Sequence, residues 1–458
     1  MLLNAIEALG STTQTFWGAE QSVLLGDILT STSLSHPRRD CLGRSVVILV
    51  EDQLASAMAL IELDGTARRM VVCPQGLNER HLRTVVEDAE ADTIVVGPGQ
   101  QIFDSLQSLF VIRCELPLAR REQAHTKAFD TEWALLTSGT SGPPKVVCHS
   151  VDGLCGAFEG GARRTPNATW ATFYDIRRYG GLQILLRAIL GGNSLVVSQA
   201  NEATANHLRR LASRGATHIS GTPSHWRKVV INPKALDFRP DYVRLSGEIA
   251  DQPLLDTLSA VFSPAEIVHA YASTEAGVAI EVGDGRAGIP LDAVGAYGAV
   301  ELRVEDGELL IRSDRAATRY LGSSAPSLRD PDGFVHTRDM VERRGDRWCF
   351  VGRRDGVINV GGLKVHPEEV EALINQHEMV RASFVKGRQN PITGMIVVAE
   401  VVLKQDGDEI TGERASRVKD EIFALCRSAL PSHKLPATIR VVDQLEMSTG
   451  GKLARRNA

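Results

Sequence analysis

The chain has 458 residues, of which 43% are hydrophobic and 23% charged, and its formal net charge is -5. This composition is typical of a globular protein with more than one domain, and it offers no basic surface for nucleic acid or an anionic membrane. The seven cysteines include no CxxC pair. That pattern argues against a zinc site or a disulfide framework and favours a reducing compartment.

The first residues, MLLNAIEALGS, lack the basic start and the long apolar stretch of a signal peptide. No apolar run approaches the roughly 18 residues that a membrane-spanning helix needs. We therefore expect a cytoplasmic protein with no membrane span and no nucleic-acid partner.

Strand-like and helix-like segments alternate from residue 45 onward. The run SVVILVE (45–51) is typical of a buried strand, and LASAMALIEL (54–63) after it has helical character. The same alternation continues through RMVVC, DTIVVG and LFVIRC and resumes in SLVVS, ANHLRRLASRG, THIS and EIVHAY. Repeated strand–helix–strand units predict parallel sheets that are covered by helices.

The pattern changes after about residue 290. The segments ELRVEDGELLIRS (301–313) and DMVERRGDRWCFVG (339–352) predict hairpins, with Asp-Gly and Gly-Asp at the turns. A compact unit follows, with a helix at PEEVEALINQ (367–376), strands around SFVKG and MIVVAEVVL, and a helix at RASRVKDEIFALCRSAL (414–430). In the first of these helices Pro367 suits the first helical position, and Val370, Leu373 and Ile374 supply a buried face.

These elements predict an α/β protein in two parts. The larger part, 1–352, is expected to hold parallel or mixed sheets sandwiched by helices together with a β-subdomain. The smaller part, 356–458, is expected to be a mobile α+β domain joined by a hinge near 353–355, where charged residues are flanked by glycine.

The stretch LLTSGTSGPPKVV (135–147) sets hydroxyls and glycines before one lysine. Such a loop can wrap phosphate oxygens with its backbone N–H groups and hydroxyls while the lysine adds a positive charge. Its residues are Thr137, Ser138, Gly139, Thr140, Ser141, Gly142 and Lys145. It is not the Walker pattern, because proline precedes the lysine and valine follows it.

Further motifs follow in order: SGE (246–248), YASTEAG (271–277), Thr337-Arg338-Asp339, VGRRDGVINVGGLKVHPEEVE (351–371) and GGKLARR (450–456). Together with TSGTSGPPK they resemble the motifs of the adenylate-forming superfamily, which includes acyl- and aryl-CoA ligases, luciferases and peptide-synthetase adenylation domains. The resemblance covers nearly the whole chain and is weakest before residue 130. It departs in Ala272, which replaces a glycine, and in Glu446, which replaces a proline.

The resemblance implies a nucleotide site. The phosphates of ATP would bind the loop from Thr137 to Lys145, and Gly247 and Glu248 would line the adenine pocket with Tyr271 packed on the base. Thr274 would bond the α-phosphate, and Glu275 would hold Mg²⁺, since a carboxylate beside a triphosphate makes sense as a metal ligand. Asp339 would accept hydrogen bonds from both ribose hydroxyls, and Arg353 would contact ribose or phosphate.

The C-terminal motifs imply a moving domain. Asp355 falls at the family's hinge, and Gly361 and Gly362 would face the thiol tunnel after rotation. Lys452 resembles the adenylation lysine, which offsets charge as the carboxylate attacks the α-phosphorus.

The acid pocket is expected in three places: 170–193, 217–226 and the residues after Ser246. Candidate lining residues are Arg178, Tyr179, Gly181, Ser220 and His225. Counted back from Gly192, Arg178 stands where acyl-CoA ligases carry a gate, and Tyr179 where amino-acid-activating relatives carry an aspartate. Because Asp175 lies one helical turn away, an amino acid stays among the candidate substrates. Arg177 and Arg178 could bind an anionic group or lie exposed on a loop.

The favoured function is ATP-dependent activation of a small carboxylic acid to acyl-AMP, with release of pyrophosphate, followed by transfer to a thiol. The thiol would be CoA or the phosphopantetheine of a carrier protein. One alternative is an adenylation enzyme that loads an acyl or amino acid onto a carrier protein or an amine. A second is a nucleotide-binding regulator without catalysis.

Overall fold

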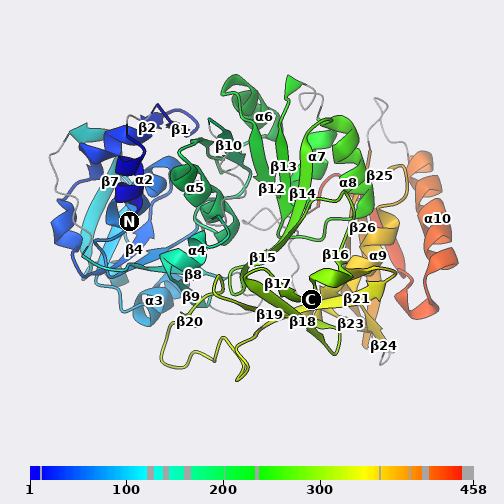
Figure 1. Ribbon diagram of the computed structural model, residues 1–458. Coiled ribbons are helices and arrows are strands. Elements are labelled where there is room, and N and C mark those ends of the chain that lie inside the picture. The colour runs from blue at the N-terminus through cyan, green and yellow to red at the C-terminus, as the bar shows by residue number, and fades with distance from the viewer. Residues whose placement is uncertain are drawn as a thin grey trace.

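The computed structural model describes residues 1–10, 13–120, 128–137, 144–158, 167–200, 202–232, 237–360, 363–390, 394–404 and 412–445. Figure 1 shows the first sheet with α3 at the left, the second sheet in the middle and the C-terminal sheet with α10 at the right. The sequence-predicted α/β class with a smaller C-terminal unit is confirmed.

The first sheet has eight strands, in the order β20-β9-β8-β5-β4-β6-β7-β3. Its strands are β20 (Arg319–Tyr320), β9 (Val146–His149), β8 (Glu132–Leu136), β5 (Arg69–Val72), β4 (Ser45–Leu49), β6 (Thr93–Val96), β7 (Phe110–Arg120) and β3 (Ser31–Leu34). In β4, Val46 and Ile48 enter one hydrophobic core while Val47 enters another. A strand that is buried on both faces explains its continuous apolar run.

The second sheet also has eight strands, in the order β15-β14-β13-β12-β10-β11-β1-β2. Its strands are β15 (Gly277–Val282), β14 (Glu266–Ser273), β13 (Tyr242–Ser246), β12 (His218–Gly221), β10 (Thr169–Thr172), β11 (Ser194–Val196), β1 (Thr15–Trp17) and β2 (Ser22–Leu24). The pairings from β14 through β1 are parallel, so the carboxyl ends of β10, β12, β13 and β14 meet at one edge. Ligands bind at such an edge in open α/β sheets.

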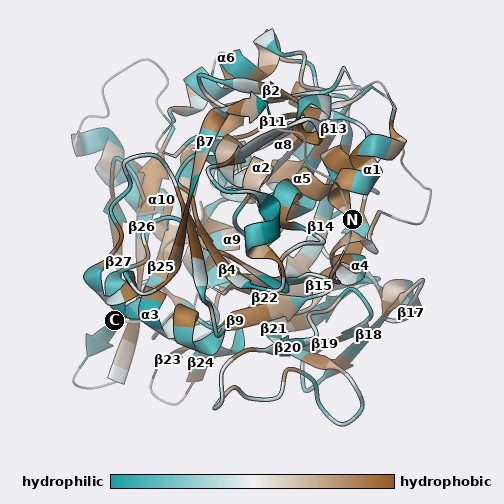
Figure 2. Cartoon of the chain, turned by 90° about the vertical axis from the view of Figure 1, so that its left-hand side faces the viewer, coloured by the Kyte–Doolittle hydropathy of each residue, from teal (hydrophilic) through white to brown (hydrophobic). Residues whose placement is uncertain are grey.

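Helices lie between the sheets and on their outer faces. The largest core joins residues of α1 (Leu2–Ala8), α2 (Gln53–Leu63) and α5 (Tyr179–Gly191) with both sheets. A second core packs α6 (Thr204–Ser213), α7 (Pro223–Val230) and α8 (Gln252–Val261) on the second sheet, and a third packs α3 (Glu79–Asp88) on the first. The hydrophobic colour accordingly runs through the interior, whereas hydrophilic colour gathers on outer helices and loops (Figure 2).

A six-stranded antiparallel sheet forms the β-subdomain, in the order β16-β22-β21-β19-β18-β17. Its strands are β16 (Ile289–Pro290), β22 (Arg347–Arg353), β21 (Val335–Arg344), β19 (Glu308–Ser313), β18 (Val300–Glu305) and β17 (Gly295–Tyr297). Both predicted hairpins are confirmed, as β18 pairs with β19 and β21 with β22. At the first turn Asp306 and Gly307 both have positive φ, which Asp-Gly turns accept.

The C-terminal sheet contains β24 (Leu363–Val365), β23 (Ile358–Val360), β26 (Gly394–Leu403), β25 (Val380–Asn390) and β27 (Thr438–Val441). It shares a separate hydrophobic core with α9 (Pro367–Ile374) and α10 (Gly412–Ala429). Pro367 occupies the first turn of α9, and Val370 and Ile374 are fully buried, as the sequence predicted, whereas Leu373 is only partly buried.

Shorter elements connect these layers. They are α4 (Val151–Cys155) and the 3₁₀ turns η1 (Leu25–Leu29), η2 (Arg38–Cys41), η3 (Asp104–Leu106), η5 (Leu291–Ala293), η6 (Arg354–Gly356) and η7 (Ser432–Lys434). The seven cysteines are free thiols, and burial raises the pKa of Cys73 and Cys114 to about 12.

Candidate active site

The phosphate-loop motif connects β8 and β9 at the edge of the first sheet. These strands are antiparallel, and Leu136 pairs with Val146. Just beyond this pair, the Thr137 N–H donates to the carbonyl of Lys145 at 3.0 Å. Thr137 and Lys145 therefore lie side by side at the two ends of the loop. The predicted phosphate-binding residues Ser138, Gly139, Thr140, Ser141 and Gly142 lie outside the described residues.

Lys145 and Glu275 are both held by a tyrosine that the sequence reasoning did not select. The Lys145 ammonium lies 5.0 Å from the centre of the Tyr320 ring. The Tyr320 hydroxyl donates to Oε1 of Glu275 at 3.5 Å. The structure thus brings the predicted phosphate-binding lysine to the ring, and the predicted metal-binding carboxylate to the hydroxyl, of one side chain.

The backbone of Thr274 and Glu275 is fixed from two sides. His149, the last residue of β9, donates from Nε2 to the Thr274 carbonyl at 2.8 Å, and the Ala317 N–H donates to the Glu275 carbonyl at 2.9 Å. Burial lowers the pKa of His149 to about 4, so its ring is neutral at pH 7. Two residues after Glu275, Gly277 has φ +75°, and a Cβ there would lie 2.3 Å from the Arg315 carbonyl oxygen. Only glycine fits this turn.

The predicted adenine and ribose residues also lie together. The Tyr271 ring stacks on Phe350, with ring centres 5.0 Å apart and planes at 5°. Its hydroxyl donates to Oδ2 of Asp339, and burial followed by the Asp339 carboxylate raises the pKa of Tyr271. Asp339 in β21 lies opposite Arg353 in β22, and Nε of Arg353 lies 3.6 Å from Oδ1 of Asp339.

Gly247 and Glu248 form the turn after β13. Gly247 has φ +84°, and the Glu248 carboxylate accepts from the Ser224 N–H in the first turn of α7 at 2.8 Å. An acceptor at a helix N-terminus is favourable because the first N–H groups have no partner within the helix. This contact places the predicted adenine-pocket turn beside the segment that contains His225.

The predicted acid-pocket residues cluster at the carboxyl ends of β10 and β12. His225 stacks on Phe173 at 5.4 Å and 18°, and its Nδ1 accepts from the Thr222 N–H at 3.2 Å. Burial lowers the pKa of His225 to about 3. Ser220 is fully buried, and its Oγ has no hydrogen-bond partner among the described residues.

The residues at the start of α5 have mainly structural contacts. Tyr179 is 7% exposed and its ring lies 5.6 Å from that of His149. A Cβ on Gly181 would lie 2.2 Å from the Asp175 carbonyl oxygen, so the helix approaches this loop too closely for a side chain. Arg178 occupies the N-cap of α5, and burial lowers the pKa of its guanidinium.

Asp175 and Arg177 form an internal pair. Arg177 donates to both carboxylate oxygens of Asp175 and to the carbonyls of Val50 and Glu51, at 2.7 to 2.9 Å. Its side chain is 2% exposed. The expectation that Arg177 could bind a substrate anion or lie exposed on a loop is therefore wrong, because its donors hold the fold together.

The predicted hinge is only partly described. Asp355 lies in the turn η6 between β22 and β23. Gly361, Gly362 and Lys452 lie outside the described residues. Their predicted roles at the thiol tunnel and in adenylation therefore remain predictions.

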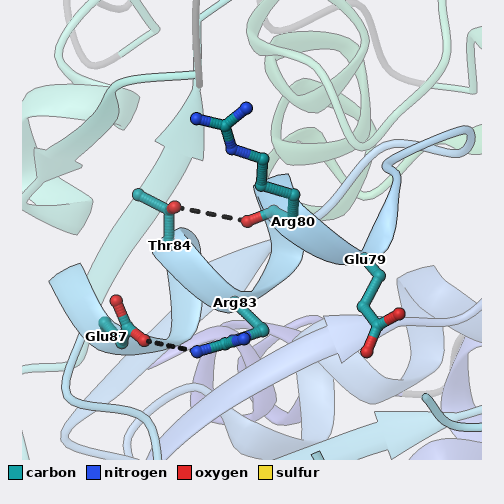
Figure 3. Close-up of a pocket in the computed structure, with 5 residues that line it drawn as sticks. All are labelled: Glu79, Arg80, Arg83, Thr84 and Glu87. Carbon is teal, nitrogen blue, oxygen red and sulfur yellow. Dashed lines mark hydrogen bonds and ion pairs between the residues drawn. The ribbon is translucent and has the colours of Figure 1, made fainter. Parts of the chain in front are cut away.

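A surface depression of ≈ 460 Å³ is lined by Glu79, Arg80, Arg83, Thr84 and Glu87. All five residues belong to one helix, α3, and four of them form two pairs along it (Figure 3). Arg83 lies 3.8 Å from Glu87, and Thr84 donates to the Arg80 carbonyl at 3.2 Å. This is a solvated helix face, and none of the predicted site residues contributes to it.

The donor set fits a nucleotide with one magnesium ion. Mg²⁺ is usually held by one or two carboxylates together with substrate phosphates and water. Glu275 supplies one such carboxylate near Lys145, and within the described residues no three His, Cys, Asp or Glu side chains form a group that could hold a metal alone. The arrangement suits a metal that arrives with a triphosphate.

The fold and this site define an AMP-forming ligase. The chain belongs to the AMP-binding enzyme family, whose model matches residues 23–321, and the model of the AMP-binding enzyme C-terminal domain matches residues 369–452. The predicted class is therefore confirmed: an enzyme that activates a carboxylic acid with ATP and passes the acyl group to a thiol.

Curated relatives are CoA ligases. The chain is 24% identical to the 2-succinylbenzoate–CoA ligase of Bacillus cereus (strain ATCC 10987 / NRS 248) over 438 residues, which cover 90% of this chain and 88% of that protein. It is 26% identical to the enzyme of the same name from Geobacillus sp. (strain WCH70) over 347 residues, which cover 71% of this chain and 68% of that protein.

Solved structures share the fold. The o-succinylbenzoate CoA synthetase (MenE) from Bacillus subtilis, in complex with the acyl-adenylate intermediate OSB-AMP, matches with a TM-score of 0.75 and 18% identity, over 99% of this chain and 96% of that chain. The anthranilate CoA ligase AuaEII in complex with anthranoyl-AMP matches with a TM-score of 0.79 and 17% identity, over 99% and 95%. Among the described helices, none has the length and apolar character needed to cross a bilayer.

Proposed function

We propose that this enzyme activates an aromatic carboxylic acid and transfers the acyl group to coenzyme A. In the first step an acid oxygen attacks the α-phosphorus of ATP and pyrophosphate leaves, which gives acyl-AMP. In the second step the thiolate sulfur attacks the acyl carbon and AMP leaves, which gives the thioester. The preferred acids are expected among ortho-substituted benzoates, since the relatives act on 2-succinylbenzoate and a fold neighbour binds anthranoyl-AMP.

One observation carries the nucleotide part of this proposal. Lys145, Glu275 and the Tyr271–Asp339–Arg353 group come from four separate segments of the sequence, yet each makes direct contacts within the site. Lys145 would offset phosphate charge, and Asp339 would accept from ribose hydroxyls. Bound Mg²⁺ would neutralise charge on the phosphate oxygens beside Glu275.

Aromatic side chains support an aromatic acid. Phe173 stacks on His225, and Tyr174 meets the same imidazole edge-on at 6.2 Å. Flat rings bind well against such side chains because stacked and edge-on contacts are both favourable. The buried Ser220 hydroxyl offers a polar contact in the same region.

The contacts of Asp175 count against an amino-acid substrate. Amino-acid-activating relatives would use a carboxylate here to bind the α-amine, but both oxygens of Asp175 accept from Arg177. The acceptor is proposed to be CoA and not a carrier protein, because the curated relatives are CoA ligases.

A two-stage assay tests the proposal. The protein is mixed with ATP, Mg²⁺ and one acid, and pyrophosphate is measured for 2-succinylbenzoate, anthranilate, benzoate, octanoate and an amino-acid mixture. CoA or a phosphopantetheinylated carrier protein is then added, and the thioester is identified by mass spectrometry. We expect pyrophosphate with an aromatic acid and a thioester with CoA.

Three other outcomes of this assay would contradict parts of the proposed function. Pyrophosphate only with octanoate or amino acids would overturn the aromatic assignment, and acyl transfer only to the carrier protein would overturn the assignment of CoA. Nucleotide binding without pyrophosphate from any acid would favour a non-catalytic regulator.

A further inference from the structure

Tyr320 occupies a fixed position beside the phosphate loop. The two-residue strand β20 pairs with β9, with Tyr320 opposite Val147. On either side of it the Thr318 N–H donates to the Cys148 carbonyl at 2.7 Å and the Leu321 N–H donates to the Val146 carbonyl at 2.8 Å. Its backbone is therefore held by the strand that begins immediately after Lys145.

The Tyr320 side chain contacts two oppositely charged groups at once. The Lys145 ammonium lies 5.0 Å from the ring centre, within the range of a cation–π contact, and the hydroxyl donates to Glu275 at 3.5 Å. A phenol has an ordinary pKa near 10, so a tyrosine hydroxyl is a neutral donor near pH 7.

Neither Lys145 nor Glu275 makes a salt bridge within the described residues. An ammonium and a carboxylate that contact the same side chain attract each other, and direct pairing would neutralise both. A lysine paired with Glu275 would bind phosphate less well, and the carboxylate would bind a metal less well. A neutral phenol that contacts both groups offers each a weak interaction that a nucleotide and its metal can replace.

We propose that Tyr320 is a positioning residue of the nucleotide site, whose ring keeps Lys145 available for the triphosphate and whose hydroxyl keeps Glu275 available for Mg²⁺. This inference rests on the proposed function, because it assigns a role within the same nucleotide site. It also divides the role of the side chain into two parts, one for the ring and one for the hydroxyl.

Two substitutions separate these parts. Tyr320→Phe keeps the ring and removes the hydroxyl, whereas Tyr320→Leu removes both. Tyr242→Phe is the matched control, since it removes the hydroxyl of a buried tyrosine that packs on Trp170 and His218. ATP binding is measured by titration calorimetry without any acid, first in EDTA and then at increasing Mg²⁺ concentrations, and thermal unfolding is recorded for each variant.

For Tyr320→Phe we expect unchanged ATP affinity in EDTA and an about three- to tenfold higher Mg²⁺ concentration for half-maximal enhancement of binding. For Tyr320→Leu we expect the same change and, in addition, an about three- to tenfold weaker affinity in EDTA. Tyr242→Phe should bind like the wild type.

A Tyr320→Phe variant with the wild-type Mg²⁺ dependence would overturn the proposal. So would equal losses in EDTA and in Mg²⁺ for both variants, which would indicate a purely structural role. If Tyr320→Leu does not fold, the Phe variant alone decides. A wild-type protein that binds ATP but releases no pyrophosphate contradicts the proposed function and leaves this test intact, whereas one that binds no ATP overturns both.

Discussion

The hydroxyl of Tyr271 donates a hydrogen bond to the carboxylate of Asp339, which joins strand β14 of the second sheet to strand β21 of the β-subdomain. The residues are 68 positions apart in the chain. Phe350 packs on the same tyrosine ring from β22, so the predicted adenine and ribose contacts form one unit at the junction of two sheets.

Asp339→Ala should raise the KM for ATP by about 10- to 100-fold, because a carboxylate that accepts from both ribose hydroxyls makes charge-assisted hydrogen bonds. Steady-state pyrophosphate release at varied ATP measures this. Tyr271→Phe is the control, since it keeps the stacked ring and removes only the bond to Asp339, and it should raise the KM less than tenfold, by about threefold. An unchanged KM in Asp339→Ala would contradict the ribose assignment.

Lys452→Ala should slow acyl-AMP formation by about 100-fold or more, as expected when a charge contact in the transition state is removed. Thioester formation from supplied acyl-AMP should survive, because that step does not need the adenylation lysine. Rapid-quench assays of the two half-reactions measure both. Lys404→Ala, an exposed lysine of the C-terminal domain, should leave both steps unchanged. Equal damage to both steps in Lys452→Ala would count against rotation of the C-terminal domain.

Asp355→Pro should have the opposite effect. Proline fixes φ and removes a backbone donor, so it should block rotation at the predicted hinge. We expect normal acyl-AMP formation and a stalled thioester step in the same half-reaction assays. Asp355→Ala, which keeps the backbone free, should support both steps, and normal thioester turnover in the proline variant would show that the hinge lies elsewhere.

Gly181→Ala should lower the free energy of unfolding by about 1–3 kcal/mol, because its Cβ would lie 2.2 Å from the Asp175 carbonyl oxygen. Gly180→Ala is a matched control in the same helix turn, where the nearest atom would lie 3.6 Å away. Alanine favours a helix by up to about 1 kcal/mol, so this control should be neutral or stabilising. Urea unfolding of both variants measures the difference. Equal stabilities would show that the backbone at 175–176 can shift to accommodate the added methyl group at little energetic cost.

Acidification should destabilise the fold through His225. Burial lowers its pKa to about 3, whereas the unfolded chain keeps a pKa near 6.5. As pH falls from 7 to 5, His225 binds a proton in the unfolded state but not in the folded state. The contribution of His225 should therefore lower the free energy of unfolding by about 2 kcal/mol. His225→Gln keeps a side chain able to accept from Thr222 at the start of α7 and should lack this part of the pH dependence. Identical pH profiles would contradict the assignment.

The fold could be predicted from the sequence wherever local pattern decides structure. The run at 45–51 fits a doubly buried strand, Asp306-Gly307 fits a hairpin turn, and Pro367 marks the start of α9. The order of the motifs likewise predicts Tyr271, Glu275 and Asp339 as site residues, and the structure brings Tyr271 and Asp339 into direct contact.

The contacts of Tyr320 and His149 could not be predicted in this way. His149 bonds to Thr274 across 125 positions, and Tyr320 reaches Glu275 across 45, so no local spacing relates them. The pairing of Arg177 with Asp175 was also missed, although the residues are two positions apart. Two arginines in a row indicate solvent exposure by composition alone, and only the fold reveals that one of them is enclosed.

Strand β20 gives the first sheet its outermost member, although it is supplied by chain that follows β19 of the β-subdomain. A protein truncated before residue 319 would leave β9 with unpaired N–H and C=O groups along its free side, a surface on which other chains can add. Production of the N-terminal sheets alone should therefore retain residues through Leu321, and nascent chains that end earlier should depend on chaperones until this short segment emerges.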